Sequence, residues 1–172
     1  MNPVQQALWE KILHFELNDP QSAFPFVQRL ALENGWKLDF AFRAILEYKR
    51  FMYLCCVAPS PMTPSDEVDQ VWHLHLIYTR SYWHDFCRDT LQREIHHGPT
   101  KGGKTEDTKY NDCYSNTLKL YEEHFTQVPP ADLWPPAEIR FAPLNFRRIN
   151  LNQYWLLPKK PFELMSRKRK GG

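Results

Sequence analysis

The sequence lacks any long apolar run. Its longest uncharged apolar stretch, residues 51–58, is far shorter than the roughly 20 residues with which a helix crosses a bilayer. This absence excludes a membrane-inserted helix from the expected structure. Polar residues follow Met1 at once, so we also expect no secretory signal peptide.

Cysteine and glycine are both scarce. None of the four cysteines stands in a C-x-x-C pair, and the adjacent Cys55 and Cys56 are poorly placed to bridge each other. We therefore expect reduced thiols and a cytoplasmic protein. The six glycines contrast with fourteen prolines, which lie outside the helical patterns and punctuate the fold.

The chain as a whole carries no large excess of positive or negative charge, but its C-terminal end is strongly basic. The net charge is only +2, yet from Arg140 onward there are nine Lys or Arg residues against the single acid Glu163. The sequence therefore predicts a helical domain over residues 1–139 and an extended basic C-terminal arm over residues 140–172, with a disordered end. Such an arm is either simply solvated or able to contact nucleic acid or another anionic surface.

Aromatic residues are abundant, at 15% of the chain, and supply ample material for a core. Apolar residues recur at helical spacing along most of the chain, and no strand pattern is evident. We predict an all-α fold of about five helices in one bundle-like domain. The expected helices cover residues 3–17, 23–34, 38–57, 64–90 and a segment that follows residue 106.

The expected helix over residues 64–90 carries an unusual set of polar side chains. Thr63 is predicted to cap it. At about 100° per residue, Asp69, His73 and Cys87 fall on one stripe of a continuous helix. Cys87 would lie about 21 Å beyond His73 along a straight helix, too far to share a metal ion. His75 points nearly opposite His73, toward an aromatic face.

Several motifs in this part of the chain resemble a known family. Residues 68–75 spell V-D-x-x-W-H-x-H, residues 95–99 spell I-H-H-G-P, and residues 129–135 spell P-P-x-x-L-W-P. Over roughly residues 65–134 the sequence resembles the glycine-rich domain-containing protein-like family. The resemblance implies a helical fold class rather than a particular function. Family members often carry a glycine-rich C-terminal tail, to which the terminal Gly171 and Gly172 would correspond.

The polar cluster suggests a metal site. Asp69 and His73 are four residues apart and can face one point, and His96 or His97 can fold back from the loop that follows the helix. A carboxylate with imidazoles suits zinc, or iron if two histidines and one carboxylate form an open face.

The alternative interpretation is a buried polar network without a metal. In that case Asp69 pairs with an arginine of the preceding helix, Arg43 or Arg50, and His73 bonds a tyrosine or a backbone carbonyl. Buried polar groups need such partners, so the spacing of an aspartate and a histidine does not by itself distinguish the two interpretations.

His75, Tyr82 and Cys87 form a second tier of candidates on the same helix. His75 on its aromatic face is either a hydrogen-bonded core histidine or a ligand. Cys87 with His84 could form a thiolate–imidazole pair, but no third group that would orient the pair is evident, so a buried inert cysteine is the alternative.

Residues 98–105 match the phosphate-loop pattern G-x-x-x-x-G-K-T literally. A true phosphate loop follows a buried strand and opens a helix, and the polar residues 92–97 are no core strand, so we discount a nucleotide hydrolase. A small-anion site remains an alternative to a solvated loop. Its groups would be Lys101, Gly102, Gly103 and Lys104.

Two functions of different classes follow. The first is a helical domain with a metal- or small-anion-binding polar site, and the sequence does not decide whether it is an enzyme. The second is a protein–protein interaction module that uses exposed aromatic residues and the basic arm. The exposure of Trp134, Tyr154 and Trp155 distinguishes packing from a binding face.

Overall fold

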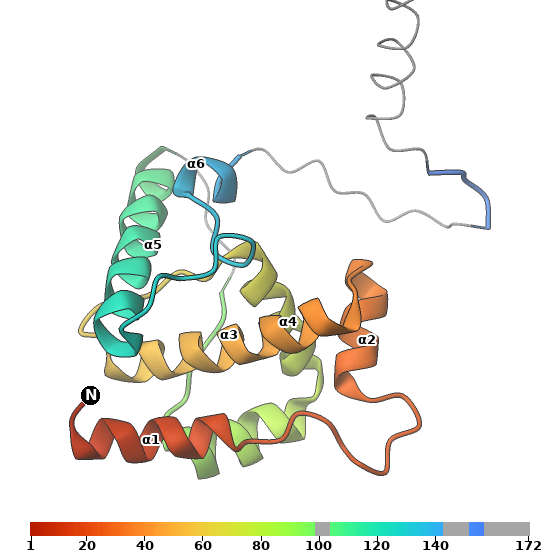
Figure 1. The fold of residues 1–172 in the computed structure, drawn as a ribbon, viewed down its shortest axis with the longest axis horizontal. Helices are drawn as coiled ribbons and strands as arrows, with labels where there is room; N and C mark the ends of the chain where they lie inside the picture. The colour runs from red at the N-terminus through yellow and green to blue at the C-terminus, as the bar shows by residue number, and fades with distance from the viewer. Residues whose placement is uncertain (99–103, 143–151, 157–172) are drawn as a thin grey trace, which may run out of the picture. The chain divides into compact units, whose positions relative to one another are not determined.

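The computed structural model describes residues 1–98, 104–142 and 152–156, with side chains from residue 110 onward in the second range. The described residues form helices and no strand, which confirms the all-α prediction. Seven helices lie within these ranges, two more than the five expected. They are α1 (Pro3–Leu13), α2 (Phe26–Asn34), α3 (Leu38–Val57), α4 (Asp66–Ile77), η1 (Ser81–Leu91), α5 (Lys104–Phe125) and α6 (Ala137–Arg140) (Figure 1).

The long helix α3 is the centre of the fold. Helices α1, α2, α4 and α5 all contact it, and α1 runs along one side of it in Figure 1. Its buried face has small side chains near the start, Ala41 and Ala44, and large ones farther along, including Tyr48, Phe51 and Met52, all of them fully buried. This packing places α4 against the core while the polar face of α4 stays accessible.

Local sequence sets the ends of the first two helices. Asn2 caps α1 through a 2.9 Å bond from the Gln5 N–H to its side chain, and Gln5 returns the bond in a capping box. Gly35 ends α2 in the left-handed conformation, with φ of 66°, where a residue without Cβ has no steric cost.

The prediction of one continuous helix over residues 64–90 is wrong. Helix α4 ends at Ile77, Tyr78 leaves the helical conformation, and the π-helix η1 begins at Ser81. In a straight helix, residues seven apart are about 10 Å apart along the axis, yet the rings of His75 and Tyr82 lie only 5.2 Å apart. The break thus lets the aromatic faces of both segments pack into one core, and the expected common stripe of Asp69, His73 and Cys87 does not exist.

The start of α4 also differs in detail from the prediction. Ser65 rather than Thr63 is the cap, and its hydroxyl accepts a 3.2 Å bond from the Val68 N–H. The Thr63 N–H instead donates to the Thr117 hydroxyl at 3.1 Å and ties the segment before α4 to α5.

The chain divides into two compact units, Met1–Ala142 and Pro143–Gly172. Arg140, where the basic arm was expected to begin, lies in α6 within the first unit. Most of the expected arm lies outside the described residues. So do Lys101, Gly102 and Gly103 of the expected small-anion site; Lys104 is the first residue of α5.

Among the helices that the structure describes, none combines the length and the apolar character needed to cross a lipid bilayer. This agrees with the short apolar runs of the sequence.

Candidate metal centre

Three side chains from two parts of the chain converge on one point. Asp69, His73 and His97 each offer a ligand atom, and these atoms all lie within 4.8 Å of one another. His97 Nε2 is 2.7 Å from Asp69 Oδ1 and 3.2 Å from His73 Nε2, and His73 Nε2 is 3.6 Å from Asp69 Oδ2. One carboxylate and two imidazole nitrogens thus meet in a single group.

Helix α4 supplies two of the three groups. Asp69 and His73 are one turn apart, so their side chains lie on the same face. Asp69 has 18% of its side chain exposed and His73 has 52%, which places the pair at the edge of the core with His73 toward solvent. A solute can therefore reach the group.

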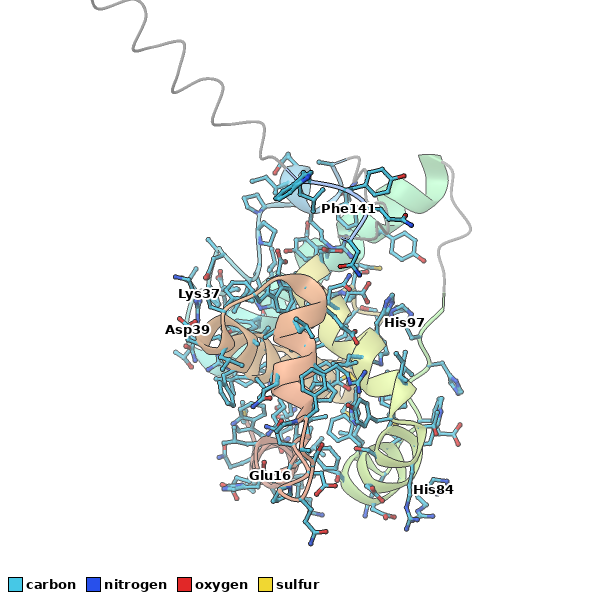
Figure 2. The ribbon with its side chains drawn as sticks, turned by 90° about the vertical axis from the view of Figure 1, so that its right-hand side faces the viewer. Glu16, Lys37, Asp39, His84, His97 and Phe141 are labelled. Carbon is cyan, nitrogen blue, oxygen red and sulfur yellow. The ribbon has the colours of Figure 1, made fainter. Side chains whose placement is uncertain are left out.

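The connector between η1 and α5, here residues 92–98, supplies the third group. Figure 2 shows His97 on this connector, next to α4. Only 20% of the His97 side chain is exposed, and its ring packs edge-on against Trp72 with centroids 4.4 Å apart. The imidazole is thus held against the helix that carries its partners.

Buried hydrogen bonds fix the path of the connector. The Trp72 indole N–H donates to the Tyr82 hydroxyl at 2.9 Å, and that hydroxyl donates to the Ile95 carbonyl. The Arg93 backbone N–H also donates to the Cys87 carbonyl at 3.0 Å. Arg93 donates to the carbonyl of Cys56 at 3.0 Å and so satisfies the last turn of α3. These anchors place residue 97 opposite Asp69.

His96 points elsewhere. Its side chain is 74% exposed, its Nε2 is 3.4 Å from a Glu94 carboxylate oxygen, and its ring lies 5.3 Å from that of Trp83. Of the two consecutive histidines, the structure therefore brings His97 to the Asp69–His73 pair and leaves His96 at the rim.

The arginines that a metal-free network would need are paired with other residues. Arg43 forms a two-pronged ion pair with Asp132, with both bonds at 2.7 Å. Arg50 binds Glu47 at 2.9 Å. Neither reaches Asp69, whose only ion-pair partners among the described residues are the two histidines.

The geometry of the three ligand atoms fits a small transition-metal ion. Zinc binds nitrogen and carboxylate oxygen at about 2.0–2.2 Å, which in a tetrahedron separates two ligand atoms by about 3.3 Å. The two Nε2 atoms are 3.2 Å apart, close to that value, and both lie within 4.8 Å of one Asp69 carboxylate oxygen. Imidazoles that carry their hydrogen on Nδ1 would point their Nε2 lone pairs into the shared space.

A pocket of about 710 Å³ opens beside the three ligands. It lies between the start of α4, the connector, the first half of α5 and α6. Besides the histidines and Asp69, it is walled mostly by apolar side chains. The lining residues outside the ligand group are Met62, Thr63, Pro64, Trp72, His96, Gly98, Tyr110, Arg140 and Phe141.

His75 lies in the core and not at this pocket. It is fully buried, its Nδ1 is 2.8 Å from the Tyr48 hydroxyl, and its Nε2 is 3.1 Å from the Ser81 hydroxyl. Burial lowers the pKa of His75 to about 3 from an ordinary 6.5. The ring is therefore neutral in the folded protein at neutral pH.

We expect the free energy of unfolding to fall by about 2 kcal/mol between pH 7 and pH 5 because of His75. The unfolded chain binds a proton on His75 below pH 6.5, whereas the folded chain does not until about pH 3, so acid favours unfolding in this window. Urea titrations of the wild type and of His75→Gln at both pH values measure the effect. The variant should be less stable at pH 7 but less sensitive to acid.

The matched control for this measurement is the exposed His84→Gln, which should keep the wild-type pH dependence. Equal acid sensitivity of His75→Gln and the wild type would show that His75 is not held neutral by burial.

Tyr82 and Cys87 are fully buried beneath the connector. Burial raises the pKa of the Cys87 thiol, which keeps it protonated. His84 instead contacts Arg88 at 3.1 Å, so no thiolate–imidazole pair forms with Cys87. Tyr82 contributes to the site indirectly, because its hydroxyl donates to the Ile95 carbonyl and so holds the connector that carries His97.

The aromatic residues of the second hypothesis differ in exposure. Trp134 is 3% exposed and donates to the Glu47 carboxylate at 2.9 Å, so it is a core residue. Tyr154 and Trp155, in the second unit, are 60% and 96% exposed. Trp134 is therefore too buried to contribute to an exposed binding face.

Arg140 was not assigned to the site from the sequence, because it was counted with the basic arm, but it lines the pocket. Tyr82 was a second-tier candidate, but the sequence did not show its bond to the Ile95 carbonyl. Both positions depend on contacts between segments distant in sequence, and no local pattern marks them.

Comparison with known proteins adds a family relationship to this geometry. Residues 38–122 match the family described as UCP032817-like. The chain is similar to this family over a segment that includes α3, α4, η1 and the connector, and therefore all three ligands. No curated protein and no solved structure matches the chain.

The match corrects the expected resemblance to the glycine-rich domain-containing protein-like family, which was wrong. That expectation rested on the V-D-x-x-W-H-x-H block. Val68, Val71, Trp72 and His75 of this block are all core residues of α4. Helix packing alone accounts for most of the motif, so the motif does not distinguish one family from another.

Proposed function

We propose that this protein binds one divalent transition-metal ion through Asp69, His73 and His97. The observation that carries the proposal is the convergence of three ligand atoms within 4.8 Å, from α4 and from a connector anchored by buried bonds. The same three residues would make a hydrogen-bonded clamp without an ion, and the experiment below separates these roles.

The donor set narrows the class of metal. Two imidazoles and one carboxylate suit zinc and iron(II), and they disfavour magnesium and calcium, which take oxygen ligands. Three protein ligands leave coordination positions open toward the pocket, as in catalytic rather than purely structural metal sites. An ion held in this way would supply Lewis acidity or an activated water molecule next to a bound solute.

Metal uptake by the purified, chelator-treated chain tests the proposal. We expect one zinc or cobalt(II) ion per wild-type chain by elemental analysis, with a visible cobalt spectrum typical of nitrogen and oxygen ligands. His97→Ala and the double variant Asp69→Ala/His73→Ala should bind more than about 100-fold more weakly, because even residues outside a ligand set cost about 10–100-fold.

The neighbouring substitution His96→Ala is the matched control. It removes the same side chain one residue away, and we expect it to keep the wild-type affinity because His96 lies outside the ligand group. The proposal fails if the wild type takes up neither zinc nor cobalt, or if His96→Ala and His97→Ala weaken binding equally.

A further inference from the structure

Arg140 is the charged side chain of the pocket that metal binding does not use. Its Nε donates to the Pro64 carbonyl at 3.0 Å, and its guanidinium lies 5.3 Å from the ring centroid of Phe141. Its two terminal nitrogens form no ion pair or hydrogen bond with any described residue. Its Nε bond thus fixes the guanidinium, and among the described residues its terminal donors have no partner.

The bond to Pro64 also sets the distance from Arg140 to the ligands. Pro64 directly precedes the Ser65 cap of α4, and Asp69 lies one helical turn beyond that cap, about 6 Å along the axis. Arg140, Asp69 and His73 line the same pocket. One small molecule can therefore touch the guanidinium at one end and reach the ligand group at the other.

Charge in the pocket favours an anion. Asp69 is the only carboxylate among the described lining residues, and it cannot balance both a divalent ion and the Arg140 guanidinium. Glu67, on α4, does not line the pocket. With a metal bound, the described lining residues carry excess positive charge.

The remaining walls favour an apolar body. Met62, Trp72, Tyr110 and Phe141 line the same pocket as the ligand group and Arg140. Figure 2 shows His97 and Phe141 on separate segments, with Phe141 farther toward the α6 end. A ligand that fills the pocket would lie against side chains that bury apolar or aromatic surface.

We infer that the pocket binds a small organic carboxylate with an apolar or aromatic body. Its carboxylate accepts hydrogen bonds from the terminal nitrogens of Arg140, and an oxygen at its other end faces the metal. A planar guanidinium whose terminal nitrogens have no partner in the described part of the chain suits a carboxylate in particular, because it can form two parallel charge-assisted bonds. This inference rests on the proposed metal site and names the class of ligand that the site takes.

A pair of chelating probes tests the inference. Benzohydroxamate and para-carboxybenzohydroxamate carry the same metal-binding group, and only the second has a carboxylate that can reach Arg140. Titrations of each into the cobalt(II)-loaded full chain are followed by the cobalt absorption spectrum. We expect the carboxylated probe to bind about 10–100-fold more tightly, the effect of a charge-assisted pair.

Substitutions assign the preference to Arg140. In Arg140→Gln the two probes should bind equally, while the affinity for cobalt stays unchanged. The control Arg80→Gln, an exposed arginine outside this pocket, should keep the full preference. Arg140→Lys keeps the positive charge but not the two-pronged geometry of the guanidinium, so it should retain only part of the preference for the carboxylated probe. This variant replaces Arg140→Gln in the test if the glutamine variant does not fold.

Each outcome separates the inference from the metal proposal. Cobalt binding with no preference between the probes, or with a preference that persists in Arg140→Gln, overturns the inference and leaves the metal site standing. Cobalt binding without any spectral response to either probe overturns it as well. A chain that binds no cobalt refutes the proposed function itself, and the inference falls with it.

Discussion

Zinc at about a thousand times its dissociation constant is expected to raise the free energy of unfolding by about 4 kcal/mol. Two ligands lie on α4 and the third on the connector, so only the folded chain brings all three together. For a chain of this length the change corresponds to a rise of about 8–16 °C in Tm. Thermal and urea unfolding with and without zinc measure the effect.

His97→Ala is the control for this stabilisation. It keeps all four cysteines and the other histidines, so any zinc that binds the unfolded chain is common to both proteins. We expect zinc to change the Tm of the variant little. A zinc-dependent rise of equal size in the wild type and the variant would show that the stabilisation arises at another place.

Glu47→Ala is expected to lower the free energy of unfolding by about 3–5 kcal/mol. Glu47 is 3% exposed and accepts bonds from Arg50 at 2.9 Å, from Tyr121 at 3.3 Å and from Trp134 at 2.9 Å. These bonds join α3, α5 and the segment that leads to α6. Truncation leaves the largely buried Arg50 guanidinium without its counter-charge and the Trp134 indole N–H without its acceptor.

An exposed pair of the same type is the matched control. Asp132 binds Arg43 at 2.7 Å, but both side chains are about half exposed, so Asp132→Ala should cost no more than about 1 kcal/mol. Glu47→Gln, which keeps an acceptor for Trp134, should fall between the two. Equal losses for Glu47→Ala and Asp132→Ala in urea unfolding would contradict the role assigned to burial.

The sequence predicted the helices best where local chemistry is decisive. The range of α3 was predicted as residues 38–57, because a long apolar pattern ends at prolines. The start of α1 at Pro3 and the end of α2 at Asn34 were likewise predicted. The break at Tyr78 was missed, since it arises from packing between α4 and η1 and no proline or glycine marks it.

The ligand group was likewise predicted from the sequence only in part. The spacing of Asp69 and His73 predicted that both face one point, because residues four apart share a helix face. Which of two consecutive histidines would join them was left open by the sequence. The choice of His97 follows from the bond of Tyr82 to the Ile95 carbonyl, a contact between residues 13 apart.

The all-α class, the main helices and the acid–imidazole pair could be predicted from the sequence, because they depend on periodicity and on near neighbours in the chain. The folded structure was needed to show which imidazole completes the group, which carboxylates bind Arg43 and Arg50, and that Arg140 lines the pocket. Those arrangements depend on where distant segments cross, and the crossings are set by the packing of buried side chains around α3.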